Sequence, residues 1–123
     1  MTNPTALIIE DEVELSEIFA DVLQGDGFVT EIVRDGQTAY DLLATSTPDF
    51  VLLDMHLPRV SGLDILALLR TEPRLANTKV MIVTADVFLA KLVADKADVV
   101  LVKPVTADDI SRHAARLLGR DTE

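Results

Sequence analysis

Five polar side chains that can bind a metal or transfer charge each follow a short apolar run of the chain. They are Glu10, Asp11, Asp54, Thr84 and Lys103. The runs that precede them span residues 7–9, 50–53, 80–83 and 99–102. Apolar runs of this kind are typical of strands buried on both faces of a parallel sheet. The carboxyl ends of such strands share one edge, where open α/β folds bind ligands, so we expect the five side chains to share one pocket.

Three of these side chains are carboxylates, and crowding them has an energetic cost. Two like charges about 4 Å apart repel by about 4 kcal/mol at an effective dielectric constant of about 20. Glu10, Asp11 and Asp54 in one pocket therefore need a nearby cation or raised pKa values. Mg²⁺ suits one or two carboxylates together with water molecules and a phosphate group. The sequence therefore predicts a Mg²⁺ site at this edge of the sheet.

Lys103 and Thr84 add groups that can hold a phosphate. The lysine ammonium is a compact positive charge that can donate to a phosphoryl oxygen. The threonine hydroxyl can donate a hydrogen bond to the same group. A carboxylate nucleophile beside Mg²⁺ and a lysine suits phosphoryl transfer, in which catalysis is mostly positioning and neutralisation of charge.

The elements that must position these residues alternate along the chain between strands and helices. Strands are expected at residues 7–9, 28–33, 50–53, 80–83 and 99–102. Helices are expected around 15–23, at 36–45 and 62–70, weakly within 88–97, and after a capping box at Thr106 and Asp109. A strand–helix unit repeated five times indicates an α/β domain whose parallel sheet carries helices on both faces. The flavodoxin-like, doubly wound order 2-1-3-4-5 is the common topology at this size.

Particular residues should mark the ends and the inner faces of the helices. Gly25 and Gly27 are expected to end the first helix, as C-cap glycines do. The inward residues expected of the first helix are Leu15, Ile18, Phe19, Val22 and Leu23. Those expected of the third helix are Leu63, Leu66 and Leu69. Residues 120–123 should form a frayed tail.

Length and composition limit the class of protein. The 123 residues suit one domain, 1–123, with a core of about 5–119, and 49% hydrophobic residues suffice to build it. The absence of cysteine excludes disulfides and cysteine-ligated metals. No apolar stretch is long enough to span a membrane and no secretory signal is present, so a cytoplasmic protein without membrane binding is expected. The net charge of −10, with scattered arginines, argues against nucleic-acid binding.

Four short motifs, in order and each at a strand end, resemble those of a known family. They are Ile8-Ile9-Glu10-Asp11-Glu12, Asp54-Met55-His56-Leu57-Pro58 with Gly62 following, Val83-Thr84-Ala85, and Lys103-Pro104. Together they make the whole chain similar to the receiver domain of two-component response regulators, which has the CheY-like fold. Each motif is weak alone, and their combination carries the resemblance.

The resemblance implies a role for each acidic residue of the pocket. Asp54 would accept a phosphoryl group and would also ligate Mg²⁺. Asp11 would bind the ion directly, and Glu10 would act through a water molecule. The backbone carbonyl of His56 would complete the metal site, whereas the His56 side chain is expected to face solvent from its loop.

The resemblance also implies how the phosphoryl group is held and where it comes from. Thr84 and Lys103 would hold its oxygens. The Lys103–Pro104 peptide bond would be cis, a conformation that has a low free-energy cost only before proline. The donor would be a phosphohistidine on a histidine kinase or a phosphotransfer protein. Such a protein is a signalling switch and not an enzyme, because it catalyses only its own phosphorylation and dephosphorylation. Its downstream protein partner is not identified by the sequence.

Two departures from the family affect the expected output. Val100 occupies the position at which most receivers carry Tyr or Phe, whose rotation couples phosphorylation to the output surface; valine is stiff and has no ring. The segment between Thr84 and Lys103 is shorter than usual, and Lys96-Ala97-Asp98 stands where Gly-Ala-Asp is common. We therefore expect a shortened or irregular fourth helix, and hypothesise an altered output surface or a different partner.

Three other functions compete with this one. A haloacid-dehalogenase-type phosphatase would need a second aspartate two residues after its nucleophile, where Val13 follows Asp11. A flavin-binding module would need a Ser/Thr/Gly-rich phosphate loop at residues 10–12, whose three acids would repel a phosphate. A degenerate receiver that acts as a phosphorylation-independent adaptor stays open, because Val100 favours altered switching. The chain could be a stand-alone receiver or a fragment of a larger regulator.

Overall fold

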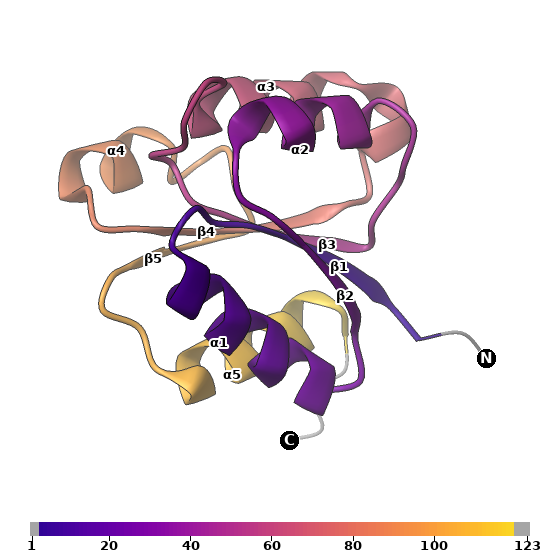
Figure 1. Cartoon of the computed structure of the whole chain (residues 1–123), viewed down its shortest axis with the longest axis vertical. Helices are drawn as coiled ribbons and strands as arrows, with labels where there is room; N and C mark the ends of the chain where they lie inside the picture. Colours follow the sequence, from indigo (N-terminus) through magenta and orange to yellow (C-terminus); the bar gives the residue numbers. More distant parts are fainter. Residues whose placement is uncertain (1–2, 120–123) are drawn as a thin grey trace.

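One parallel sheet forms the centre of the molecule. The computed structural model describes residues 3–119. Its five strands are β1 (Thr5–Ile9), β2 (Val29–Val33), β3 (Phe50–Leu53), β4 (Lys79–Thr84) and β5 (Val99–Val102). They lie in the order β2-β1-β3-β4-β5, and every neighbouring pair is parallel (Figure 1). The predicted doubly wound α/β fold and its strand order are therefore confirmed.

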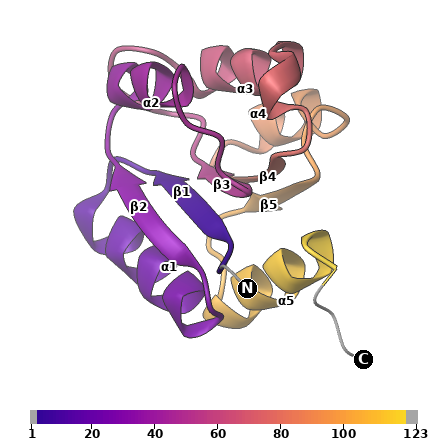
Figure 2. The same ribbon diagram turned by 90° about the vertical axis from the view of Figure 1, so that its right-hand side faces the viewer.

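Helices cover both faces of this sheet. The α-helices are α1 (Val13–Gly25), α2 (Gly36–Leu43), α3 (Gly62–Thr71), α4 (Val87–Leu92) and α5 (Ala107–Leu117), and a 3₁₀ turn at Pro73–Leu75 follows α3. The first and last helices pack side by side on one face, and α2, α3 and α4 lie on the other (Figure 2). This division follows from right-handed crossovers between parallel strands, which send helices to opposite faces when the chain reverses direction along the sheet.

The central strand β3 supplies side chains to both cores. Val51 and Leu53 belong to the core on the side of α2 and α3, whereas Phe50 and Leu52 belong to the core on the side of α1 and α5. All four side chains are fully buried, which explains their continuous apolar run in the sequence. Burying each of them contributes about 1.5–3 kcal/mol, so the strand that leads into Asp54 is firmly held.

Short polar side chains cap the first turns of α2, α3, α4 and α5. Asp35 caps α2 and Asp86 caps α4, each by accepting a hydrogen bond from a backbone N–H of the first turn. The capping box predicted at Thr106 and Asp109 is confirmed, because each of these side chains accepts a hydrogen bond from the other residue's backbone N–H. A cap of this kind contributes about 1 kcal/mol.

Two residues that were predicted to face inward lie at the surface. Ile18 exposes 53% and Leu63 exposes 40% of its surface. The residues buried in α1 are Ser16, Phe19, Ala20 and Leu23, and the side chains buried in α3 are Ile65, Leu66 and Leu69. Because Ser16 and Ala20 are small enough to lie against the sheet, the buried stripe of α1 runs through them and turns Ile18 outward.

The ends of most elements differ from the predicted ends by one or two residues. The second helix, for example, ends at Leu43 and not at residue 45. Gly25 is the last residue of α1, and Gly27 follows with φ 98°, the left-handed conformation that ends helices. The Lys103–Pro104 peptide bond is cis, as the resemblance implied.

The fourth helix is short, as predicted. It spans Val87–Leu92, with Ala90 as its one buried residue, and the chain reaches β5 through turns at residues 93–98. The predicted frayed tail at residues 120–123 lies outside the described residues. Among residues 3–119, the helices are all too short or too polar to cross a membrane.

Candidate functional site

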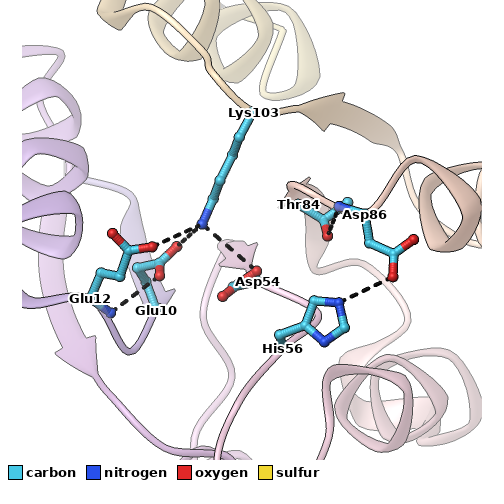
Figure 3. A network of polar contacts seen from close by, with 7 residues as sticks. All are labelled: Glu10, Glu12, Asp54, His56, Thr84, Asp86 and Lys103. Atoms are coloured by element: carbon cyan, nitrogen blue, oxygen red, sulfur yellow. Dashed lines mark hydrogen bonds and ion pairs between the residues drawn. The ribbon is translucent and has the colours of Figure 1, made fainter.

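The carboxyl ends of four strands bring the predicted pocket residues together. Figure 3 shows Lys103 reaching from the end of β5 toward Glu10 and Asp54, with Thr84 on the other side of Asp54. Glu10, Asp54 and Thr84 are buried, with 0%, 5% and 0% of their surface exposed. Carboxylate oxygens of Glu10, Asp11 and Asp54 all lie within 4.8 Å of one another. Three carboxylates at this spacing form a candidate site for a hard cation.

Backbone hydrogen bonds hold the pocket residues just beyond the strand ends. The Asp54 N–H donates to the Ile9 carbonyl at 2.9 Å, and the Lys103 N–H donates to the Thr84 carbonyl at 2.8 Å. These bonds continue the parallel ladders by one residue. The register of the sheet therefore decides which side chains enter the pocket.

Lys103 neutralises part of the negative charge in the pocket. Its ammonium donates to Oε1 of Glu10 at 3.1 Å and lies 3.9 Å from both Oε2 of Glu12 and Oδ1 of Asp54. The side chains of Lys103, Glu10 and Asp54 are 16%, 0% and 7% exposed, so solvent screens the attraction of the lysine to these two carboxylates weakly. Glu12 was not predicted as a site residue, although it stands in the same acidic run as Glu10.

Burial raises the pKa values of the two buried carboxyl groups. Burial first, and then the charge of Asp54, raise the pKa of Glu10 to about 7, against the lowering effect of Lys103. Burial also raises the pKa of Asp54, while Lys103 and the backbone N–H groups of His56 and Met55 lower it in part. Burial therefore disfavours the ionised forms of both carboxyl groups, and a cation bound between them would favour those forms.

A second set of polar contacts lies on the β4 side of the pocket. The Asp86 backbone N–H donates to Oγ1 of Thr84 at 3.1 Å. Nε2 of His56 lies 3.2 Å from Oδ2 of Asp86 (Figure 3). The His56 side chain is 65% exposed, which agrees with its predicted loop position, but its carboxylate partner was not predicted. From the sequence, Asp86 is recognisable only as a helix-capping residue, since its pairing with His56 depends on how two loops meet.

Gly62 allows the chain after β3 to pass close to Asp54. A Cβ atom at this position would lie 2.7 Å from the Asp54 carbonyl oxygen and 2.6 Å from the Cα atom of Met55. The Gly62 N–H donates to the Met55 carbonyl at 3.1 Å, which closes the loop. Only glycine therefore fits this point of the Asp54 motif without a shift of the backbone.

Val100 occupies the position at which the resemblance implies an aromatic switch. It lies on β5 opposite Ile82 of β4, and it is partly buried against the core on the side of α2 and α3. Its short branched side chain packs there and has no ring that could rotate. In the described structure, Val100 therefore contributes to core packing.

Comparison with known proteins identifies relatives over nearly the whole chain. The model of the response regulator receiver domain matches residues 6–115. The DNA-binding response regulator MtrA of Mycolicibacterium paratuberculosis is 31% identical over 118 residues, which cover 95% of this chain and 52% of that protein. The chain thus spans about half the length of the MtrA relatives.

Solved structures of similar sequence share the fold. A CheY-like response regulator receiver domain from Methylobacillus flagellatus has a TM-score of 0.83 at 28% identity, over 94% of this chain and 99% of that one. The signal receiver domain of a signal transduction histidine kinase from Syntrophus aciditrophicus has a TM-score of 0.85 at 28% identity, over 98% and 95% of the two chains. The sequence relatives and these solved structures are therefore all response regulators or signal receiver domains.

Proposed function

The chain belongs to the response regulator receiver domain family, and we propose that it accepts a phosphoryl group on Asp54 from a phosphohistidine donor. The transfer depends on Mg²⁺ and switches the binding of the domain to a partner protein. One observation carries this proposal: the buried Asp54 carboxylate lies within 4.8 Å of Glu10 and Asp11 and 3.9 Å from the Lys103 ammonium. Switching by phosphorylation is the general function of the family.

The clustered carboxylates fit a divalent cation, because their charge exceeds what Lys103 neutralises. Asp11 and Asp54 would hold Mg²⁺ directly, Glu10 would hold it through water, and the His56 carbonyl would complete the site. When bound, the ion would supply positive charge that lets a phosphate group approach these carboxylates.

The transfer itself relies on charge and position. An oxygen of Asp54 attacks the phosphorus of the phosphohistidine, a P–O bond forms while the P–N bond breaks, and the leaving imidazole takes a proton from water. Lys103 turns from the carboxylates to one phosphoryl oxygen, and the Thr84 hydroxyl donates to another. The product is an acyl phosphate in place of the Asp54 carboxylate.

A histidine kinase or a phosphotransfer protein would supply the phosphoryl group, and a downstream protein would read the result. The MtrA relative is named a DNA-binding response regulator, but this chain covers about half of that protein. The net charge of this chain, −10, favours a protein partner over nucleic acid. We therefore propose that the domain acts as a signalling switch and not as an enzyme on other substrates.

A phosphorylation-independent adaptor is the second candidate. Val100 favours it, because valine cannot supply the ring rotation through which most receivers couple the site to the output surface. The complete set of pocket residues favours the first candidate instead. The short α4 is consistent with an altered output surface in either case.

An intact-mass assay with acetyl phosphate, with and without Mg²⁺, tests the proposal on the wild type and on Asp54→Asn. We expect a Mg²⁺-dependent gain of one phosphoryl group in the wild type and none in the variant. A gain in Asp54→Asn would place the acceptor elsewhere. No gain in the wild type, together with no Mg²⁺ binding by calorimetry, would favour the adaptor.

A further inference from the structure

The loop after Asp54 is held from two sides by helix-capping carboxylates. Residues 54–61 join β3 to α3. On one side, Nη2 of Arg59 lies 3.2 Å from Oδ1 of Asp35, which caps α2. On the other side, Nε2 of His56 lies 3.2 Å from Oδ2 of Asp86, which caps α4. The same loop is therefore tied to the first turns of two helices.

Asp86 uses one carboxylate oxygen for each of its two contacts. Its Oδ1 accepts from the Leu89 backbone N–H at 3.0 Å, and its Oδ2 faces His56. The Leu89 N–H first, and His56 less strongly, lower the pKa of Asp86, so the carboxylate is ionised at neutral pH and the ring nitrogen donates to it. A rigid carboxylate cannot follow a displaced His56 without weakening the cap on α4.

Both ends of this bridge lie next to the reacting groups. The backbone N–H of His56 hydrogen-bonds the Asp54 carboxylate, and the backbone N–H of Asp86 donates to the Thr84 hydroxyl. Phosphorylation converts the charged Asp54 carboxylate into an acyl phosphate, whose remaining carboxyl oxygen is a weaker acceptor. The same phosphoryl group would engage the Thr84 hydroxyl. The change at the Asp54 carboxylate therefore acts on His56, and the contact with Thr84 acts on Asp86. These are the two residues that form the bridge.

The fourth helix is sensitive to its cap. It has six residues and one buried residue, whereas α2 has eight residues, of which three are buried. A helix this short has little packing of its own, so capping contributes a large share of its stability. A change at Asp86 is therefore felt along the whole of α4.

We propose that the His56–Asp86 bridge transmits the state of Asp54 to α4. Phosphorylation displaces His56, the displaced ring pulls on the capping carboxylate of Asp86, and the first turn of α4 loosens. The inference rests on the proposed phosphorylation of Asp54. It gives the site a route to the surface that needs no aromatic ring at Val100, and it ends at a helix whose Phe88 is 76% exposed.

Three variants separate the bridge from other effects. His56→Ala removes one end of the bridge. Asp86→Ser keeps an N-cap, because serine caps helices well, but its hydroxyl is too short to reach His56. Arg59→Gln is the matched control, because it removes the corresponding contact of the same loop with Asp35 on the α2 side.

Amide hydrogen exchange of residues 87–93, with and without Mg²⁺ and beryllofluoride, measures the response of α4. Beryllofluoride mimics the phosphoryl group, and fluorine NMR of the same samples reports whether it is bound. In the wild type and in Arg59→Gln, loading should speed exchange in α4 about fivefold, the size of a lost N-cap. In His56→Ala and Asp86→Ser, loading should leave exchange in α4 unchanged.

A wild-type response of α4 in loaded His56→Ala or loaded Asp86→Ser would overturn the bridge. Loss of the response in loaded Arg59→Gln would also overturn it. The response of α4 would then depend on the loop contacts in general and not on the His56–Asp86 bridge in particular. If His56→Ala fails to bind beryllofluoride, the response of α4 in loaded Asp86→Ser alone tests the bridge. A wild type that binds no beryllofluoride overturns the proposed function and the inference together, whereas binding without a change in α4 overturns the inference alone.

Discussion

Lys103 lies closer to Glu10 than to Asp54. Its Nζ is 3.1 Å from Oε1 of Glu10 and 3.9 Å from Oδ1 of Asp54. Glu10 and Lys103 are 93 residues apart and follow β1 and β5, which are not neighbours in the sheet. The lysine therefore crosses the pocket between these strands. The role proposed for this lysine, to hold a phosphoryl group on Asp54, therefore competes with its contact with Glu10.

This contact should be measurable as a coupling energy. Lys103→Gln should destabilise the metal-free protein by about 1–3 kcal/mol, because the buried Glu10 loses its charged donor. Adding Glu10→Gln should recover most of the loss, since two amides pair without a buried charge. Urea unfolding of the wild type, both single variants and the double variant measures this coupling. Effects that simply add would show that the two side chains do not interact.

Asp11 should strengthen Mg²⁺ binding if the three carboxylates form the metal site. Asp11→Asn removes one negative oxygen ligand and should weaken Mg²⁺ binding by roughly tenfold or more. Glu14→Gln is the matched control, because Glu14 is an exposed acid in the first turn of α1. Isothermal calorimetry measures both affinities. If the two variants weaken Mg²⁺ binding equally, the ion is attracted by the overall negative charge of the protein and is not bound at a defined site.

The position of the pocket could be predicted because it depends on local pattern and on one rule of sheet topology. Asp54 and Thr84 each follow a continuous apolar run, and parallel strands of this fold end at the same edge. The order β2-β1-β3-β4-β5 then brings the ends of β1, β3, β4 and β5 together. These relationships need no knowledge of how individual side chains pack.

The pairing of side chains could not be predicted in the same way. Which carboxylate Lys103 contacts depends on the positions of two strands that are not neighbours, and the His56–Asp86 contact depends on two loops. Ile18 shows the same limit for helices. Its apolar spacing fits an inner face, but the small Ser16 shifts the buried stripe of α1 away from it.

Asp109 should make stability depend on pH through the capping box of α5. Its pKa is lowered, chiefly by the hydrogen bond from the Thr106 backbone N–H. A carboxyl group whose folded pKa lies below the ordinary value of 3.8 contributes stability above that value and loses it as pH falls through the folded pKa. The wild type should therefore be more stable than Asp109→Asn near neutral pH and lose this advantage below pH 3.8.

Asparagine is the appropriate replacement in this experiment, because it keeps a side-chain oxygen for the Thr106 N–H but does not titrate. Urea midpoints of the wild type and of Asp109→Asn, compared at about pH 7 and about pH 3, isolate the contribution of this one group from all other carboxyl groups. A difference that stays constant between the two pH values would contradict the prediction.

Two glycines should respond to alanine with opposite signs. Gly62→Ala should destabilise the protein by about 1–3 kcal/mol, because its Cβ would lie 2.7 Å from the Asp54 carbonyl oxygen. Gly25→Ala is the matched control at the last residue of α1, where a Cβ meets nothing within 4 Å, and it should stabilise by about 0.5–1 kcal/mol. Urea unfolding of both variants measures the two signs.

The Gly62 clash should also reach the site, because the atoms that would be displaced belong to Asp54 and Met55. Phosphorylation of Gly62→Ala by acetyl phosphate should therefore be slower than that of the wild type, whereas Gly25→Ala should react at the wild-type rate. Intact mass against time measures both rates on folded protein. A destabilised Gly62→Ala variant that reacts at the wild-type rate would contradict this prediction. It would show that the loop shifts without moving the Asp54 carboxylate, and that Gly62 does not position the acceptor.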